Sequence, residues 1–266
     1  MHPVLFHIGS VLIPSYGAIG ALGVLAALFL AQRTARPAGV NPAHVWNLCI
    51  LAVFAALAGQ RLTLIIANWS ALRLHPAWAL GLAMVHHPLL TGAGALAALA
   101  VSAWYVRWQK MSALATADAL AAPLAIGLAF EQFGALLAGS GFGTDADPKL
   151  PWAVTYSSTL AYRWSGTPLG VPLHPVQAYA AISFLTLAIF LVMWIPMRRQ
   201  RGDLAGICLM GLGTVIYLTE IWRDPEGRGL ILRGALDGPQ IVAVVFVIAA
   251  GFILRERKPH TEATRD

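Results

Sequence analysis

The stretch "PVQAYAAISFLTLAIFLVMWIPM" (residues 175–197) contains no charged residue and is followed at once by Arg198 and Arg199. A helix needs about 20 predominantly apolar residues to cross the hydrocarbon core of a bilayer. Lipid offers the backbone no hydrogen-bond partners, so a spanning segment satisfies its N–H and C=O groups internally as a helix. The stretch therefore predicts a transmembrane helix.

The rest of the chain has the same character. Of its 266 residues, 58% are hydrophobic and 11% are charged, and the mean hydropathy is +0.68. These values are typical of a membrane protein. Apolar runs of spanning length lie near 11–31, 44–67, 88–106, 117–138, 175–197, 204–222 and 239–255. We therefore expect an all-α, polytopic integral membrane protein with seven transmembrane helices, in which residues 1–266 form a single transmembrane domain.

The basic residues orient the helices, because they gather after every second run. These groups are Arg33 and Arg36, Arg107 and Lys110, Arg198, Arg199 and Arg201, and Arg255, Arg257 and Lys258, ten of the 18 Lys and Arg residues. The positive-inside rule makes these segments cytoplasmic. The N-terminus and the loops around 68–87, 139–174 and 223–238 are then outside, with the C-terminus in the cytoplasm. Anionic lipid accounts for most of the formal charge of +6, so no nucleic acid is expected as a partner.

The first residues and the cysteines exclude some other interpretations. "MHPVLFHIGS" (1–10) has no Lys or Arg to form a basic n-region, and no small-residue cleavage pattern follows the first run, so we expect an uncleaved helix there. Cys49 and Cys208 both fall in apolar runs. Two buried cysteines indicate packing residues rather than a disulfide framework or a metal site, and we expect neither metal nor cofactor.

Polar side chains within apolar runs are the first functional candidates, because burying them in lipid is costly. They are Gln60, Arg61, Asp118, Glu131, Gln132, Glu220 and Arg223. The guanidiniums of Arg61 and Arg223 match phosphate oxygens. Glu220 lies three residues before Arg223, on the same helix face, and an intramembrane Glu–Arg pair can also serve only to fix helix packing. Both alternatives stay open. We expect Asp118 to cap the start of its own helix.

The loop 139–174 is the longest connection. Glycines at 139, 141 and 143 allow close approach of a ligand, an anion nest, or simply a helix C-cap followed by a turn. The aromatic residues Trp152, Tyr156, Tyr162 and Trp164 suit the lipid headgroup level. At the end of the loop, first-turn geometry explains Pro175 and interfacial anchoring explains Tyr179. These two explanations fit Pro175 and Tyr179 better than they fit His174 and Gln177.

The chain resembles the prolipoprotein diacylglyceryl transferase family of bacterial inner-membrane enzymes. Five segments carry the resemblance, in the family's order: "IPSYGAIGALGV" (13–24), "AGQRLTLII" (58–66), "ADALAAPLAIGLAFEQFGALLAGSGFG" (117–143), "PLHPVQAY" (172–179) and "EIWRDPEGRG" (220–229). Together they cover nearly the whole chain.

The resemblance implies transfer of the diacylglyceryl group of phosphatidylglycerol, or of another anionic phospholipid, to the lipobox cysteine of a prolipoprotein signal peptide, with glycerol phosphate leaving. It implies catalytic roles for Arg61, His174, Glu220 and Arg223. It implies substrate-binding roles for Tyr16, Gln132, Gly143, Gln177 and Tyr179. We expect these residues, Tyr179 apart, to face one outward-opening cavity in a multi-pass protein of the bacterial inner membrane.

Some columns depart from the family. The signature Gly-Arg-x-Gly-Asn and its later Asn-Gly-Glu read here as Glu131 to Ala135 and Ala138 to Ser140, so Gln132 replaces the phosphate-binding arginine. The His-Gly-Gly of the third helix reads Thr91, Gly92, Ala93, and Ile216 replaces a second arginine. The candidates for a general base are then His86, His87, Glu131 and His174. A relative that transfers another group or uses another acceptor, and a non-catalytic protein that binds phospholipid or lipoprotein, are the alternatives. A transporter is less favoured, because neither an inverted repeat nor paired broken helices are evident.

Overall fold

The computed structural model describes residues 2–8, 11–74, 88–224 and 237–255. The long helices are α1 (Ser15–Ala35), α2 (Pro42–Ala67), α5 (Pro88–Trp108), α6 (Ala113–Ala138), α8 (Val176–Trp194), α9 (Asp203–Glu220) and α10 (Gly238–Leu254). The first six are long and apolar enough to cross a membrane, and α10 is a shorter apolar helix. Each falls on one of the seven predicted runs. The sidedness of these helices stays a prediction.

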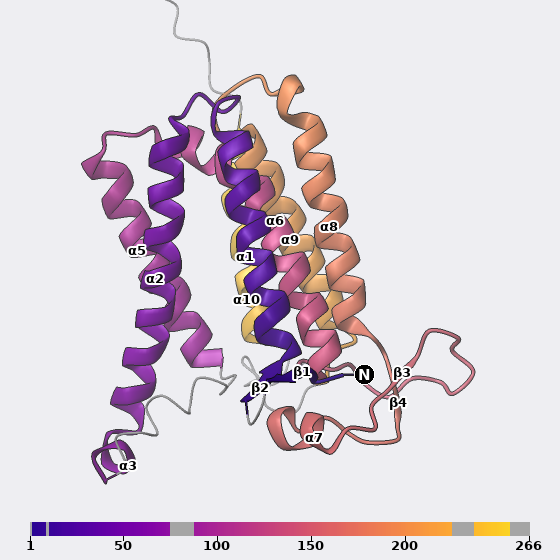
Figure 1. Cartoon of the computed structure of the whole chain (residues 1–266). Coiled ribbons are helices and arrows are strands. Elements are labelled where there is room, and N and C mark those ends of the chain that lie inside the picture. Colours follow the sequence, from indigo (N-terminus) through magenta and orange to yellow (C-terminus); the bar gives the residue numbers. More distant parts are fainter. Residues whose placement is uncertain (1, 9–10, 75–87, 225–236, 256–266) are drawn as a thin grey trace, which may run out of the picture.

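Short elements gather at one end of the helices (Figure 1). They are β1 (Val4–Ile8), β2 (Val11–Pro14), β3 (Val154–Thr155), β4 (Pro172–Leu173) and α7 (Thr159–Ser165); α3 (Trp69–Leu74) follows α2, and a 3-10 turn, Ile195–Met197, follows α8. Strands β1 and β2 pair antiparallel, as do β3 and β4. Predicted residues His86 and His87 and the tail beyond Arg255 lie outside the described residues.

The first helix begins four residues later than predicted. Residues 11–14 pair with β1 instead, and Pro14 at the N-cap has an extended backbone with ψ of 138°. The side chain of Ser15 donates a hydrogen bond to the carbonyl of His2, and its backbone N–H donates to that of Pro3. An apolar stretch as short as "VLIP" suits a strand as well as a helix, so hydropathy alone extended the helix too far.

The helices form a bundle with a separate pair beside it (Figure 1). Helix α6 packs against α1, α8 and α9, and α10 packs against α9, whereas α2 packs mainly against α5. The core of the bundle is rich in small residues such as Ala121, Ala125 and Ala188, and Cys208 is buried there as predicted. Small side chains let helix backbones approach closely, which is how helices associate in lipid.

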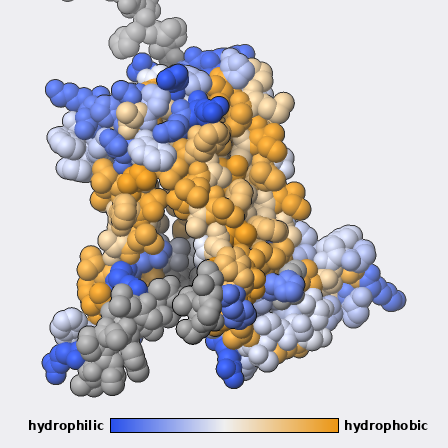
Figure 2. Space-filling model, in the orientation of Figure 1, coloured by the Kyte–Doolittle hydropathy of each residue, from blue (hydrophilic) through white to orange (hydrophobic). Residues whose placement is uncertain are grey.

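The α2–α5 pair depends on glycine in the same way. A Cβ on Gly94 would lie 2.9 Å from the carbonyl oxygen of Ala56, and a Cβ on Gly59 would lie 2.7 Å from the Cβ of Ala97. These contacts leave no room for larger side chains between the two helices. In the orientation of Figure 1, the surface of the molecule has a hydrophobic band over its middle and hydrophilic residues toward both ends (Figure 2).

Asp118 corrects one expectation. Its own helix is capped by Ser112, whose side chain accepts the N–H of Ala115, while Asp118 lies within α6. The buried carboxylate accepts the backbone N–H groups of Gly202 and Ala205 at 2.7 and 2.9 Å. Asp118 therefore caps α9 from a neighbouring helix. Arg198 pairs with the same carboxylate at 3.3 Å.

Candidate functional site

The predicted polar residues of the loop meet where α6 and α9 end and α8 begins. Helix α6 ends at Gly139, whose φ of 87° is in the left-handed region, and the N–H groups of Gly139 and Ser140 both donate to the carbonyl of Ala135. Of the interpretations of the glycine run, the C-cap followed by a turn describes Gly139. The chain then turns back across the end of the bundle.

Gly143 lies between two other segments of backbone. It forms an antiparallel bridge with Arg223, flanked by hydrogen bonds from Thr144 N–H to the carbonyl of Trp222 and from Asp224 N–H to that of Phe142. On its other side the N–H of His174 donates to the carbonyl of Thr144 at 3.0 Å.

A side chain has no room at this position. A Cβ on Gly143 would clash with the carbonyl oxygen of His174 and lie 2.9 Å from that of Trp222. Only glycine fits between these two segments of backbone. The close approach that the glycine allows is thus one of protein backbone, and it fixes the entry to α8 against the exit from α9.

Arg223 and Glu220 form the pair that their spacing predicted. The Nε atom lies 2.7 Å from Oε1 of Glu220, which is 5% exposed, and Nη1 donates to the carbonyl of Gly141 at 3.3 Å. The Nε–H is not aimed at the carboxylate, so the contact is an ion pair rather than a directed hydrogen bond. The guanidinium has five N–H groups. Among the described residues, the Gly141 carbonyl accepts one of them, so the others can meet an anion.

Gln177 and Tyr156 tie the loop to the bundle. Gln177 is 1% exposed, and its Nε2 donates to the carbonyl of Ser140 at 2.9 Å. The hydroxyl of buried Tyr156 donates to the carbonyl of Leu136 at 3.0 Å. Burial raises the pKa of Tyr156 to about 12, partly offset by a hydrogen bond with Gln177. Tyr156 was predicted at the headgroup level, but its side chain is enclosed by protein.

His174 belongs to a short polar chain on the outside of the loop. Its Nδ1 lies 3.5 Å from the hydroxyl of Tyr179, which accepts a hydrogen bond from Nε1 of Trp152 at 2.9 Å. Trp152 is exposed, whereas His174 and Tyr179 are half-buried. The structure therefore brings predicted residues His174 and Tyr179 together.

A second polar group lies within α1 and α6. The hydroxyl of Tyr16 donates to Oε1 of Glu131 at 2.9 Å, and Nε2 of Gln132 donates to Oε2 of Glu131 at 2.6 Å. Oε1 of Gln132 is buried and has no hydrogen-bond partner within the described ranges. Glu131, a candidate base by its depth in an apolar run, lies outside the predicted set of site residues. The structure gives it Tyr16 and Gln132 as partners.

Glu131 lies on a side of α6 that its neighbours leave partly open. Leu124 precedes it by seven residues, which is two helical turns, and is 50% exposed.

Arg61 lies on α2, two residues after Gly59, which contacts α5, and its side chain is half-buried. That Arg61 shares a cavity with the other predicted site residues stays a prediction.

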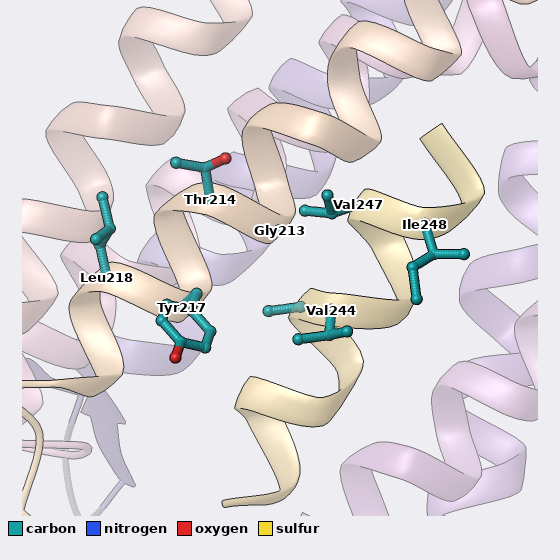
Figure 3. A pocket seen from close by; sticks show the side chains of 8 residues that line it. Gly213, Thr214, Tyr217, Leu218, Val244, Val247 and Ile248 are labelled. Carbon is teal, nitrogen blue, oxygen red and sulfur yellow. The ribbon is translucent and has the colours of Figure 1, made fainter. Parts of the chain in front are cut away.

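A separate groove lies between α9 and α10 (Figure 3). Its volume is about 240 Å³, and its lining includes Gly213, Thr214, Tyr217, Val244 and Val247. The hydroxyls of Thr214 and Tyr217 are its polar groups, and Thr214 already donates to the carbonyl of Met210. The groove has no charged residue in its lining and takes no part in the site.

Comparison with known proteins identifies the family. The family described as "Prolipoprotein diacylglyceryl transferase" matches residues 3–255. Among the relatives, the phosphatidylglycerol–prolipoprotein diacylglyceryl transferase of Methylibium petroleiphilum is 30% identical over 266 aligned residues, covering 95% of this chain and 94% of that protein. Those of Clostridium tetani and Vibrio cholerae, of the same name, are 27% and 29% identical, covering 95% and 92% of this chain and 96% and 88% of theirs. The resemblance carried by the five segments is thereby confirmed, and the chain belongs to the prolipoprotein diacylglyceryl transferase family.

Proposed function

We propose that this protein transfers the diacylglyceryl group of phosphatidylglycerol to the cysteine thiol of a prolipoprotein signal peptide. The observation that carries the proposal is the Arg223 guanidinium, which Glu220 and the Gly141 carbonyl hold at the polar end of the helices. Its remaining N–H groups suit a phosphate oxygen. Membership of the family supports the same reaction.

The transfer makes one bond and breaks another. The thiol gives its proton to a base, and the thiolate sulfur attacks the glyceryl carbon that carries the phosphate ester. A C–S bond forms, the C–O bond breaks, and glycerol phosphate leaves with the electron pair on its phosphate oxygen. Arg223, with Arg61 as the second cation, stabilises the charge that develops on that oxygen.

His174 is the base in this proposal. In the tautomer with the proton on Nδ1, that N–H faces the Tyr179 hydroxyl and the lone pair of Nε2 is left to take the thiol proton. Glu131 is the second candidate. Both of its oxygens already accept hydrogen bonds, from Tyr16 and Gln132.

The remaining substrate-binding residues complete the proposal. Tyr16, Gln132 and Gln177 orient the headgroup. Oε1 of Gln132, which has no hydrogen-bond partner among the described residues, accepts a headgroup hydroxyl. The site opens to the outer leaflet of the bacterial inner membrane, with the N-terminus outside and the C-terminus in the cytoplasm. Residues 1–266 act as a single transmembrane domain.

The test is a direct search for the product. Purified protein is incubated with phosphatidylglycerol and a lipobox peptide, and mass spectrometry detects a diacylglyceryl thioether on the cysteine. Arg223→Ala should abolish the product, whereas Arg163→Ala, a matched change at an exposed arginine of α7, should leave it unchanged.

A second function is favoured by one observation. Gln132 occupies the column of the family's phosphate-binding arginine, and its amide N–H is held by Glu131. This arrangement suits a relative that binds phospholipid or lipoprotein without transfer, or one that uses another acceptor. Absence of the thioether while phosphatidylglycerol still binds would favour that alternative.

A further inference from the structure

A basic pocket lies at the opposite end of α1 from Tyr16. Its volume is about 620 Å³, and its lining consists of Gln32, Arg33, Arg36, Pro37 and Pro42, where α1 ends and α2 begins. At 1.5 Å per residue, Arg33 is about 25 Å along the helix axis from Tyr16. The volume is in the range of about 300–1,000 Å³ that small-molecule sites occupy. The pocket is therefore distinct from the proposed transferase site.

The turn after α1 does not need these arginines. The carbonyls of residues 34–36 accept hydrogen bonds from the backbone N–H groups of residues 38–40, at 2.9 to 3.1 Å. The turn thus satisfies these carbonyls with its own backbone. Capping of these carbonyls therefore does not explain why the two guanidiniums line the pocket.

The two arginines also differ from Arg198 and Arg223, which pair with carboxylates. Over the ranges that the structure describes, no carboxylate lies within salt-bridge distance of Arg33 or Arg36. Two guanidiniums one helical turn apart, without acidic neighbours, form a site for an anion.

An apolar strip on α1 leads to the pocket. Leu22, Leu25 and Phe29 are 52%, 62% and 59% exposed, and with Arg33 they follow the three- and four-residue spacing of one helix face. The guanidinium of Arg33 lies 4.6 Å from the centre of the Phe29 ring. This cation–π contact places the charge at the end of the strip.

We propose that this pocket binds the phosphate headgroup of an anionic phospholipid, with an acyl chain of the same lipid along Leu22, Leu25 and Phe29. The guanidinium forks match phosphate oxygens. Basic pockets at the ends of transmembrane helices are known to hold anionic head groups. The apolar strip selects a lipid over a soluble phosphate compound, because a soluble compound would leave the strip unused. The proposal does not depend on the transferase reaction.

The test measures binding of dioleoyl phosphatidic acid, a lipid other than the proposed donor, to the whole protein by native mass spectrometry. The matched control changes Arg107, in the last turn of α5, and Lys110, in the turn between α5 and α6. Residues of that turn and of the α1–α2 turn pack in one cluster, so both lie at the same end of the helices. Arg33→Gln with Arg36→Gln should weaken binding about tenfold or more, whereas Arg107→Gln with Lys110→Gln should leave it within about twofold.

Each contrary result overturns the proposal. Equal losses in the two double variants would indicate general attraction to basic residues, and wild-type affinity in the Arg33 and Arg36 variant would exclude the pocket. Binding of glycerol 3-phosphate as tight as that of the lipid would assign the pocket to soluble phosphate compounds. If the double variant unfolds, Phe29→Leu keeps both arginines and an apolar side chain while removing the ring. It should weaken lipid binding by a smaller factor, and unchanged binding would count against the strip.

Discussion

Gly143 and Arg223 pair backbone to backbone, and the carbonyl oxygen of His174 also lies against the glycine. The pairing joins the loop after α6, the start of α8 and the end of α9. The position of the Arg223 guanidinium therefore depends on a residue that has no side chain.

Gly143→Ala tests this dependence. The added methyl group would displace the carbonyls of His174 and Trp222, so we expect a loss of about 1–3 kcal/mol in the free energy of unfolding and a marked loss of transferase activity. Denaturant titration in detergent measures the first. Gly251→Ala is the control, because nothing lies within 4 Å of a Cβ there. Equal stability of the two variants would contradict the tight packing of Gly143.

Asp118→Asn should destabilise the protein without touching the polar end of the bundle. The neutral amide loses the charge that pairs with Arg198 and accepts only on one atom, so part of the α9 cap is lost. We expect a decrease of about 2–3 kcal/mol in the free energy of unfolding. Asp147→Asn, at an exposed turn, should change it by less than about 1 kcal/mol. A matching effect of the two variants would rule out the capping role.

Tyr156 predicts a loss of stability at alkaline pH. Burial raises the pKa of this phenol from an ordinary value of about 10 to about 12, so the folded protein retains the proton that the unfolded chain releases. Its contribution is complete below pH 10 and decreases as the pH rises from about 10 to about 12. Unfolding midpoints between pH 8 and 12 should fall less steeply for Tyr156→Phe than for wild type. Exposed Tyr162 gives the control, since Tyr162→Phe should keep the wild-type slope.

Two variants separate the candidate bases. We expect His174→Gln to lower the rate of diacylglyceryl transfer about a hundredfold or more and to change its pH dependence. Glu131→Gln keeps one acceptor oxygen for the two donors Tyr16 and Gln132 and should lower the rate by less than about tenfold. The measurement is the initial rate of thioether formation between pH 6 and 9. The opposite order would assign the proton to Glu131.

The helices could be predicted because the signal for each one lies within its own stretch of sequence. Seven charge-poor runs of spanning length need no knowledge of partners, and the Glu220–Arg223 pair follows from a spacing of three on one helix. The bridge between Gly143 and Arg223 depends on where separate loops meet, and no local pattern contains that information. Tyr16 and Glu131 likewise meet only through the packing of α1 on α6.

Asp118 also shows what local sequence leaves open. Its residue type indicated a helix cap correctly, but the chain offers several helix starts and local sequence cannot choose among them. The start of α1 was misplaced for a different reason. Residues 11–14 are apolar enough for lipid, while their pairing with β1 involves a segment outside the apolar run.

The cap that α6 provides for α9 has a consequence for biosynthesis. The buried N–H groups of Gly202 and Ala205 donate to the Asp118 carboxylate, and without this acceptor they would be left as unsatisfied backbone donors. Because the ribosome makes α6 before α9, the acceptor is already integrated when α9 leaves the translocon. Truncated chains that end after α9 should therefore integrate stably, whereas a fragment that begins after α6 should be retained by quality control and degraded.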